Sequence, residues 1–255
     1  MDAWITMIFP FIWILLRTTG VLITAPVFGA KYVPWMVKVT IALVLGYVLW
    51  PRVPAAPIPT SLLGFLMCGA SEILFGLIMG FCGTIVMAAI ETAGHIADIE
   101  IGFGMANVID PQYGQPSPIL GIFKYLLILL VFLSINGHHL FIKALHESFH
   151  LVPAGAAFIP KMWTQVGFTA AASIFKTAII LSCPVWASAL IVDFALGAIA
   201  RTVPQMNVFV VGMPLKTLIG LATVFASIAF YGIFTEQITL SMQRLLESLL
   251  GVIGR

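Results

Sequence analysis

The chain has 255 residues, of which 61% are hydrophobic and only 9% are charged, and its mean hydropathy is +1.10. A soluble domain carries about 25% charged residues, so the composition excludes an ordinary soluble protein and predicts an all-α, polytopic membrane or membrane-assembled protein. The net charge of +2 and the lack of a basic run exclude nucleic acid as a partner.

Long apolar segments follow one another along the chain and predict helices. They cover residues 3–28, 36–50, 61–97, 119–137, 162–200 and 217–235. Within the third segment, Gly76 and Gly80 have a spacing that lets two helices approach closely. Pro184 should kink the fifth segment or divide it into a hairpin. Beyond Glu236 the pattern is amphipathic, and one face carries Ile238, Met242, Leu245, Leu246, Leu249, Leu250 and Ile253.

Four charged residues lie inside these apolar segments: Arg17, Glu72, Lys176 and Asp193. A charge at the centre of a bilayer costs about 3 kcal/mol on insertion scales, so such residues normally face a bundle interior or a cavity. Four of them indicate helices that face other protein, which predicts a subunit of a large helical assembly. The basic residues of the loops divide almost evenly between the two sides and set no orientation.

Residues 94–118 form a segment of mixed polarity, rich in glycine and proline, between two apolar segments. Irregular backbone at membrane depth must be buried in protein or line an aqueous cavity. The segment is therefore either an ordinary flexible loop or a packed plug. Its apolar side chains are compatible with a plug, because a ring of such groups can seal a pore against water and ions, and both interpretations stay open until the family resemblance described below is added, which favours the plug.

His146-Glu147-Ser148-Phe149-His150 matches HExxH, the pattern in which two histidines bind zinc and the glutamate acts as a base. A zinc site needs a third protein ligand, which nothing in the sequence marks. An amphipathic interfacial helix explains the same residues better. We therefore expect no enzyme, no metal and no cofactor, and keep an intramembrane zinc metalloprotease as an alternative function.

His95 and Asp98 lie near Glu91 at helical spacing. They could form a proton relay, which would make the chain a proton-coupled transporter of small solutes. The polar end of a helix that enters a wet cavity is the preferred interpretation, because such transporters usually show two repeated halves and this chain has no internal repeat.

Residues 201–216 carry the strongest resemblance to a known family. Arg201-x-x-Pro204-Gln205-x-Asn207-Val208-Phe209, followed by Gly212-x-Pro214-x-Lys216, resembles the signature of the FliR family, the flagellar type III export-gate subunits related to the T-type injectisome subunit. Asp193-x-Ala195-Leu196-Gly197, Arg17-x-x-Gly20 and Ala25-Pro26-Val27-Phe28 are similar to the same family. These motifs span nearly the whole chain in the family's order.

The resemblance implies a single export-gate domain over residues 1–255, built of kinked helical hairpins, in a right-handed helical and pore-forming gate. Its partners would be the P-type and Q-type gate subunits, the B-type and A-type export apparatus proteins, and unfolded flagellar substrates that pass through the channel. The expected location is the bacterial inner membrane at the flagellar basal body, with part of the gate above the membrane plane.

Two groups of site residues follow from the charges and the resemblance. A plug loop of about residues 100–118 would close the channel through Gly104, Met105, Ala106, Asn107, Val108, Ile109 and Asp110. Buried or intersubunit polar contacts are expected from Arg17, Glu72, Asp193, Arg201, Gln205, Asn207 and Lys216. Four of these polar residues belong to a second structured break, residues 201–216.

Overall fold

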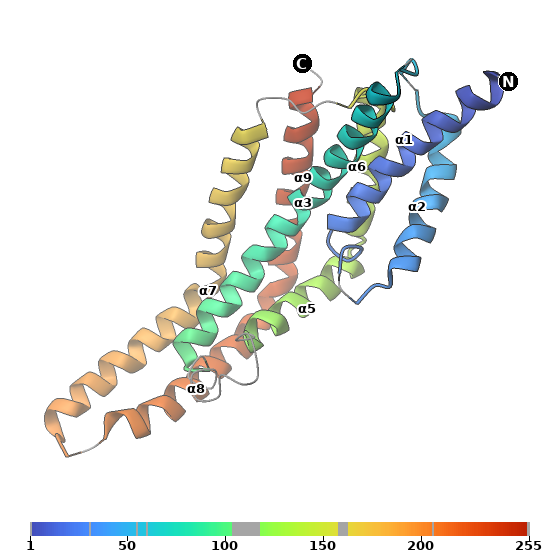
Figure 1. Ribbon diagram of the computed structural model, residues 1–255. Helices are drawn as coiled ribbons and strands as arrows, with labels where there is room; N and C mark the ends of the chain where they lie inside the picture. The colour runs from blue at the N-terminus through green and yellow to red at the C-terminus, as the bar shows by residue number, and fades with distance from the viewer. Residues whose placement is uncertain are drawn as a thin grey trace. The chain divides into compact units, whose positions relative to one another are not determined.

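The computed structural model describes residues 2–30, 32–54, 56–59, 61–103, 118–157, 163–205 and 207–253. The regular secondary structure of these residues is helical, which confirms the all-α fold (Figure 1). The helices are α1 (Asp2–Thr24), α2 (Trp35–Leu49), η1 (Trp50–Arg52), α3 (Leu62–Ile101), α5 (Ile119–Ser134), α6 (His138–Leu151), α7 (Trp163–Thr202), α8 (Val208–Ser227), η3 (Ile228–Phe230) and α9 (Tyr231–Ile253).

Several of these helices are long and apolar enough to cross a membrane. Among the described residues there are four such stretches, or five if α5 and α6 together count as one broken span. The four are Trp35–Arg52, Leu62–Ile101, Ile174–Thr202 and Val210–Gly251. At 1.5 Å per residue, the 40 residues of α3 extend over about 60 Å, twice the hydrocarbon thickness of about 30 Å. The prediction of a polytopic membrane protein is confirmed.

The chain forms two compact units. Unit 1 consists of Met1–Val86, Phe132–Ala171 and Ile238–Arg255, and unit 2 consists of Met87–Val131 and Ala172–Gln237. Helices α3, α5, α7 and α9 each begin in one unit and end in the other. The single domain over residues 1–255 therefore stays a prediction.

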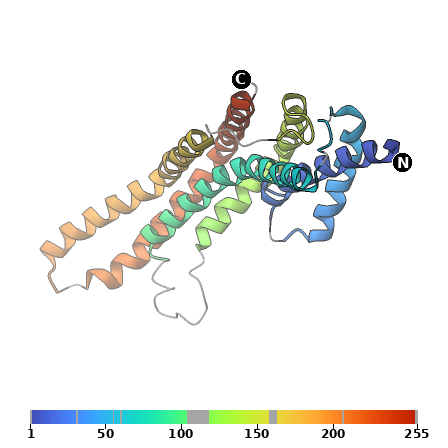
Figure 2. The same ribbon diagram turned by 45° about the horizontal axis from the view of Figure 1, so that its top comes forward.

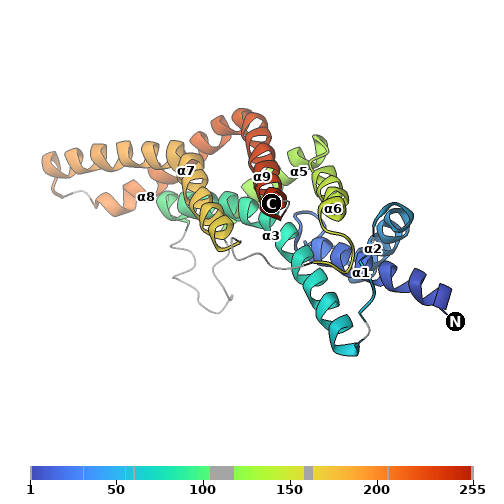
Figure 3. The same cartoon turned by 90° about the horizontal axis from the view of Figure 1, so that it is seen from above.

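In unit 1, α1 packs against both α2 and α3 (Figure 3). Glycines make the second contact possible. A Cβ atom at Gly20 would lie 2.6 Å from the carbonyl oxygen of Ile73, and one at Gly76 would collide with the carbonyl oxygen of Arg17. Thr24 Oγ1 adds a hydrogen bond of 2.8 Å to the carbonyl oxygen of Leu77. The close approach expected from the glycine spacing of α3 is thus present between α3 and α1.

The end of α9 lies in unit 1 and is amphipathic, as predicted. Its buried residues are Ile238, Met242, Leu246, Leu249 and Leu250, and Leu245 is half-buried. The side chain of Ile253, the last expected member of this face, lies outside the described side chains. Leu246 and Leu250 share a small cavity with Leu140 and Ala144 of α6, so this face of α9 packs on α6.

In unit 2, the chain departs from two expectations. Helix α7 continues through Pro184 to Thr202, so of the two expected effects of this proline the division into a hairpin is wrong, and the kink stays a prediction. The hairpin turn lies between α7 and α8 instead (Figure 2). The expected break at residues 201–216 is confined to 203–207, because α8 begins at Val208 and contains Pro214. A proline inside a helix removes one backbone hydrogen bond, and the apolar 20-residue α8 tolerates that loss.

The core of unit 2 joins the end of α3 to α5, α7 and α8. It contains Ala97, Ile101, Leu120, Val185 and Val224. Phe103, just beyond α3, packs on this core. The last described residues before the expected plug are therefore attached to a packed base.

Candidate functional site

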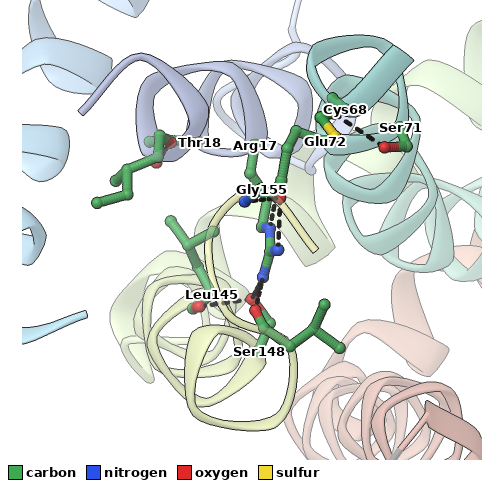
Figure 4. Close-up of polar contacts among 10 residues, drawn as sticks. Arg17, Thr18, Cys68, Ser71, Glu72, Leu145, Ser148 and Gly155 are labelled. Atoms are coloured by element: carbon green, nitrogen blue, oxygen red, sulfur yellow. Dashed lines mark hydrogen bonds and ion pairs between the residues drawn. The ribbon is translucent and has the colours of Figure 1, made fainter. Parts of the chain in front are cut away.

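Arg17 of α1 and Glu72 of α3 form an ion pair inside unit 1 (Figure 4). Arg17 Nε donates to Glu72 Oε2 over 2.6 Å, and Nη2 donates to Oε1 over 3.0 Å. Both side chains are 0% exposed. The attraction between two buried charges offsets the cost of their desolvation only when their remaining donors and acceptors also form hydrogen bonds. The stability of this site therefore depends on the other members of the network.

The other donors and the faces of the guanidinium are also satisfied. Arg17 Nη1 donates to Ser148 Oγ over 3.2 Å and to the carbonyl oxygen of Val152 over 3.1 Å. The guanidinium carbon lies 4.1 Å from the ring centre of Phe149 and 4.7 Å from that of Phe75. Cation–π contacts are stronger when desolvated. The arginine thereby joins α1, α3 and α6.

Gly155 completes the network from the connection after α6. Its N–H donates to Glu72 Oε1 over 2.7 Å. Its φ of +89° is a conformation that favours glycine, and a Cβ atom there would collide with the ring of Trp13. Among the described residues, both charges of this network are fully enclosed by α1, α3, α6 and the connection after α6.

A second polar site lies at the base of the expected plug, in unit 2. The carboxylate of Asp98, near the end of α3, is 3% exposed. It accepts hydrogen bonds from the backbone N–H of Leu120 at 3.1 Å and of Gly121 at 3.4 Å, at the start of α5. The first N–H groups of a helix lack intrahelical partners, and a carboxylate is a favourable partner for them. Asp98 therefore ties together the two helices that flank residues 102–118.

Close packing reinforces this tie. A Cβ atom on Gly94 of α3 would collide with the backbone of Gly121 in α5. Thr217 Oγ1 of α8 donates to the carbonyl oxygen of Ile101 over 2.9 Å, and Gly220 leaves room for the Ile101 side chain. The plug residues themselves, 104–110, lie outside the described residues, so their predicted role stays a prediction.

Lys124 of α5 is a buried charge that the sequence analysis missed. It is 2% exposed, and among the described residues its Nζ has no hydrogen-bond partner. It lies one helical turn after Leu120, and Asp98 is a nearby opposite charge. The signal was available, because Lys124 is the only charge in the apolar segment 119–137.

Lys216 of α8 and Asp193 of α7 form a pair in unit 2, with 2.8 Å between Nζ and Oδ2. Glu100 Oε2 of α3 lies 3.7 Å from the same Nζ. The Asp193 side chain is 49% exposed, and the pair borders a cavity of about 340 Å³ lined by Leu196, Gly197 and Val208 among others. These charges are paired within the chain but remain accessible.

The other polar residues of the α7–α8 region do not gather at one site. Arg201 and Gln205 are exposed. Asn207 is also exposed and precedes α8, and its carbonyl oxygen accepts from the N–H of Val210 at 3.1 Å. Of the seven polar residues, the structure therefore joins Arg17 with Glu72 and Asp193 with Lys216.

His146 and His150 of α6 face each other, with 3.2 Å between their Nε2 atoms. Among the described residues, no group of three or more His, Cys, Asp or Glu side chains could hold a metal ion. The third zinc ligand required by the protease alternative is thus not found in that part of the chain. His95 is exposed, while Asp98 is engaged at the start of α5.

Comparison with known proteins decides the family. The sequence profile described as "Bacterial export proteins, family 1" matches residues 8–242. The chain belongs to this family. A bacterial export protein of family 1 from Bacillus subtilis strain 168, named "Flagellar biosynthetic protein FliR", is 34% identical over 252 residues, which cover 96% of this chain and 97% of the relative.

Two further family members carry the same name. The protein from Escherichia coli K12 is 29% identical over 249 residues, covering 98% of this chain and 95% of its own length. The protein from Aquifex aeolicus VF5 is 29% identical over 213 residues, which cover 83% of this chain and 82% of the relative. The resemblance to the FliR family is confirmed, and this chain is a bacterial export protein with several helices able to cross a membrane.

Proposed function

We propose that this chain is a structural subunit of the flagellar protein export gate, and that residues 104–110 plug the channel through which unfolded substrates pass. Membership of the export family and similarity to proteins named for flagellar biosynthesis support the first part. The proposed location is the inner membrane at the flagellar basal body. The subunit acts without chemistry of its own.

The observation that carries the plug is the tie at its base. Asp98 binds the N–H groups that open α5, and Ile101 is held by Thr217. A segment that is fixed at both ends by packed helices can hold its apolar side chains in the channel. The residues between the two fixed ends can still move aside. A plug needs both properties, because it must seal against ions at rest and move for a passing chain.

Exposed apolar side chains on the helices support the proposed assembly with the P-type and Q-type subunits. On α7, Ile191 is 71% and Phe194 is 77% exposed, and on α8, Leu218 is 67% exposed. Apolar surface this extensive marks a contact with protein or lipid. The B-type and A-type export proteins would join the same apparatus.

Replacement of residues 104–110 by glycine and serine at unchanged length tests the plug. The expected result is a gate that still co-purifies with its partners but makes proteoliposomes leaky to small ions. Replacement of Pro57, Ile58 and Pro59, which lie in a connection between helices, is the matched control and should stay ion-tight. An intact complex that remains ion-tight after the plug replacement would contradict the proposal.

A further inference from the structure

Unit 1 has a groove between α2 and α6, apart from the ion pairs described above. Its volume is about 390 Å³. Its apolar wall is formed by Leu45, Val48 and Leu49 of α2 and by Ile142 of α6. An apolar groove of this size would accommodate part of a hydrocarbon chain, so the groups at its polar rim decide what it binds.

Two cations lie at the rim. Arg52, at the end of η1, and Lys143 of α6 both line the groove and are exposed. Arg52 donates one hydrogen bond, over 2.7 Å from Nη1 to the carbonyl oxygen of Val48. Within the described part of the chain neither cation forms an ion pair with a carboxylate. Lys143 also lines a second cavity, which Glu147 and Glu247 border, but neither carboxylate lies within ion-pair distance of it among the described residues. The groove therefore combines an apolar wall with two unpaired positive charges.

Imidazoles extend the same rim. His139 and His146 of α6 line the groove. The Nδ1 atom of His146 is buried and has no hydrogen-bond partner among the described residues, while its Nε2 faces His150. When His150 donates to that Nε2, the proton of neutral His146 lies on Nδ1, which can then donate to an anionic oxygen.

We propose that this groove binds an anionic membrane phospholipid, with its phosphate between Arg52 and Lys143 and an acyl chain along the α2 wall. The stretch Trp35–Arg52 is long and apolar enough to cross a membrane, and Leu43, Val44 and Tyr47 are exposed on it. An aromatic residue followed by a basic one at the end of such a stretch is typical of the membrane interface, and Trp50 and Arg52 provide it. Basic pockets between membrane helices bind lipid phosphates in this way.

A lipid fits the groove better than an acidic protein segment does. The apolar α2 surface continues directly from the wall of the groove, so an acyl chain that leaves the groove remains in contact with apolar side chains. An acidic peptide would need partners for its backbone polar groups, which this wall lacks. A free phosphate would use the rim but leave the wall uncovered.

Native mass spectrometry of the full chain in detergent tests the proposal, with phosphatidylglycerol, phosphatidylcholine and inorganic phosphate as probes. Phosphatidylglycerol should bind at least tenfold more tightly than phosphatidylcholine, and phosphate should not displace it at equal concentration. Each cation near an anionic lipid contributes about a fivefold factor. The double variant Arg52→Gln with Lys143→Gln should therefore weaken phosphatidylglycerol binding about 25-fold.

Two controls separate the groove from general charge and from misfolding. Arg244→Gln removes an exposed cation of unit 1 that does not line the groove, and should leave lipid binding unchanged. The pair Arg52→Lys with Lys143→Arg keeps both charges and should keep the preference for phosphatidylglycerol. Equal binding of the two lipids, equal loss in Arg244→Gln, or displacement by phosphate would overturn the proposal. So would loss of the lipid preference in the complex with partner subunits, which would indicate an acidic partner segment in the groove.

Discussion

Arg17 and Glu72 lie 55 residues apart in sequence and meet through two hydrogen bonds in the interior of unit 1. Their junction also binds Ser148, Val152 and Gly155, so one arginine and one glutamate connect three helices and a turn.

Glu72→Ala should destabilise the chain by about 3–5 kcal/mol, because it leaves the Arg17 charge buried without a partner. The double variant Arg17→Met with Glu72→Met removes both charges, so its free energy of unfolding should fall by less than that of Glu72→Ala alone. The free energy of unfolding, measured by titration of the detergent-solubilised chain with a denaturing detergent, checks both. The single variants Arg17→Met and Glu72→Met complete the cycle, and a loss of unfolding free energy in the double variant equal to the sum of their two losses would show that the pair is not coupled.

Gly76→Ala should push α1 away from α3, because the new Cβ atom collides with the carbonyl oxygen of Arg17. Overpacking of a tight contact typically costs about 1–3 kcal/mol. The matched control is Gly251→Ala in α9, where no atom of the described residues lies within 4 Å of the added atom. That control should be neutral or slightly stabilising, since alanine favours a helix. The same unfolding titration compares the two, and equal stability would refute the close contact.

Asp98→Ala and Asp98→Asn should separate two roles of this side chain. Alanine removes the acceptor for the N–H groups of Leu120 and Gly121 and should lower stability by about 0.5–2 kcal/mol, as the loss of a helix cap does. Asparagine keeps an acceptor oxygen but removes the charge opposite Lys124. Hydrogen exchange at Leu120 should rise sharply in the alanine variant and less in the asparagine variant. Unchanged hydrogen exchange at Leu120 in both variants would contradict the connection that Asp98 makes between α3 and α5.

Lys216→Ala and Asp193→Ala should change the unfolding free energy by less than about 1 kcal/mol, because an accessible ion pair is screened by solvent. If these residues contact partner subunits, co-purification of the gate should fall in both variants. The charge exchange Lys216→Asp with Asp193→Lys restores an internal pair, and adding Glu100→Gln removes the repulsion between Glu100 and the carboxylate introduced at position 216, so this exchanged variant distinguishes the two roles. Full assembly of the exchanged variant would show that only the internal pair matters.

Sequence alone predicted much of this fold because burial and helical periodicity are local signals. The amphipathic end of α9 was read from its spacing, and the charges of Arg17 and Glu72 indicated a buried environment. Which charges form pairs depends on the tertiary structure. Arg17 and Lys216 are both basic residues in apolar surroundings in the sequence, yet Arg17 is fully buried and Lys216 is accessible. The break before α8 was placed too broadly, because Pro214 indicates a break locally but lies within an apolar helix that continues around it.

Other features could not be read because they depend on a neighbour in space. The helical spacing groups Asp98 with His95, but the partners of Asp98 in the structure are the N–H groups at the start of α5, 22 and 23 residues later. Lys124, the one charge in the apolar segment 119–137, stands out in the sequence in the same way as Arg17 and Glu72. That Asp98 is its nearby opposite charge depends on how α3 and α5 pack, which the sequence does not show.

The order in which the Arg17 junction can form also bears on biogenesis. Glu72 meets its arginine as soon as α3 has been made, but the amide that completes its shell belongs to Gly155, 83 residues later. At 5–20 residues per second, the ribosome needs about 4–17 s to make that interval. Until then, the Glu72 carboxylate lacks the N–H group of Gly155 from which it accepts a hydrogen bond of 2.7 Å in the folded chain. Truncation before residue 148 should therefore leave a translocation intermediate that quality-control proteases recognise.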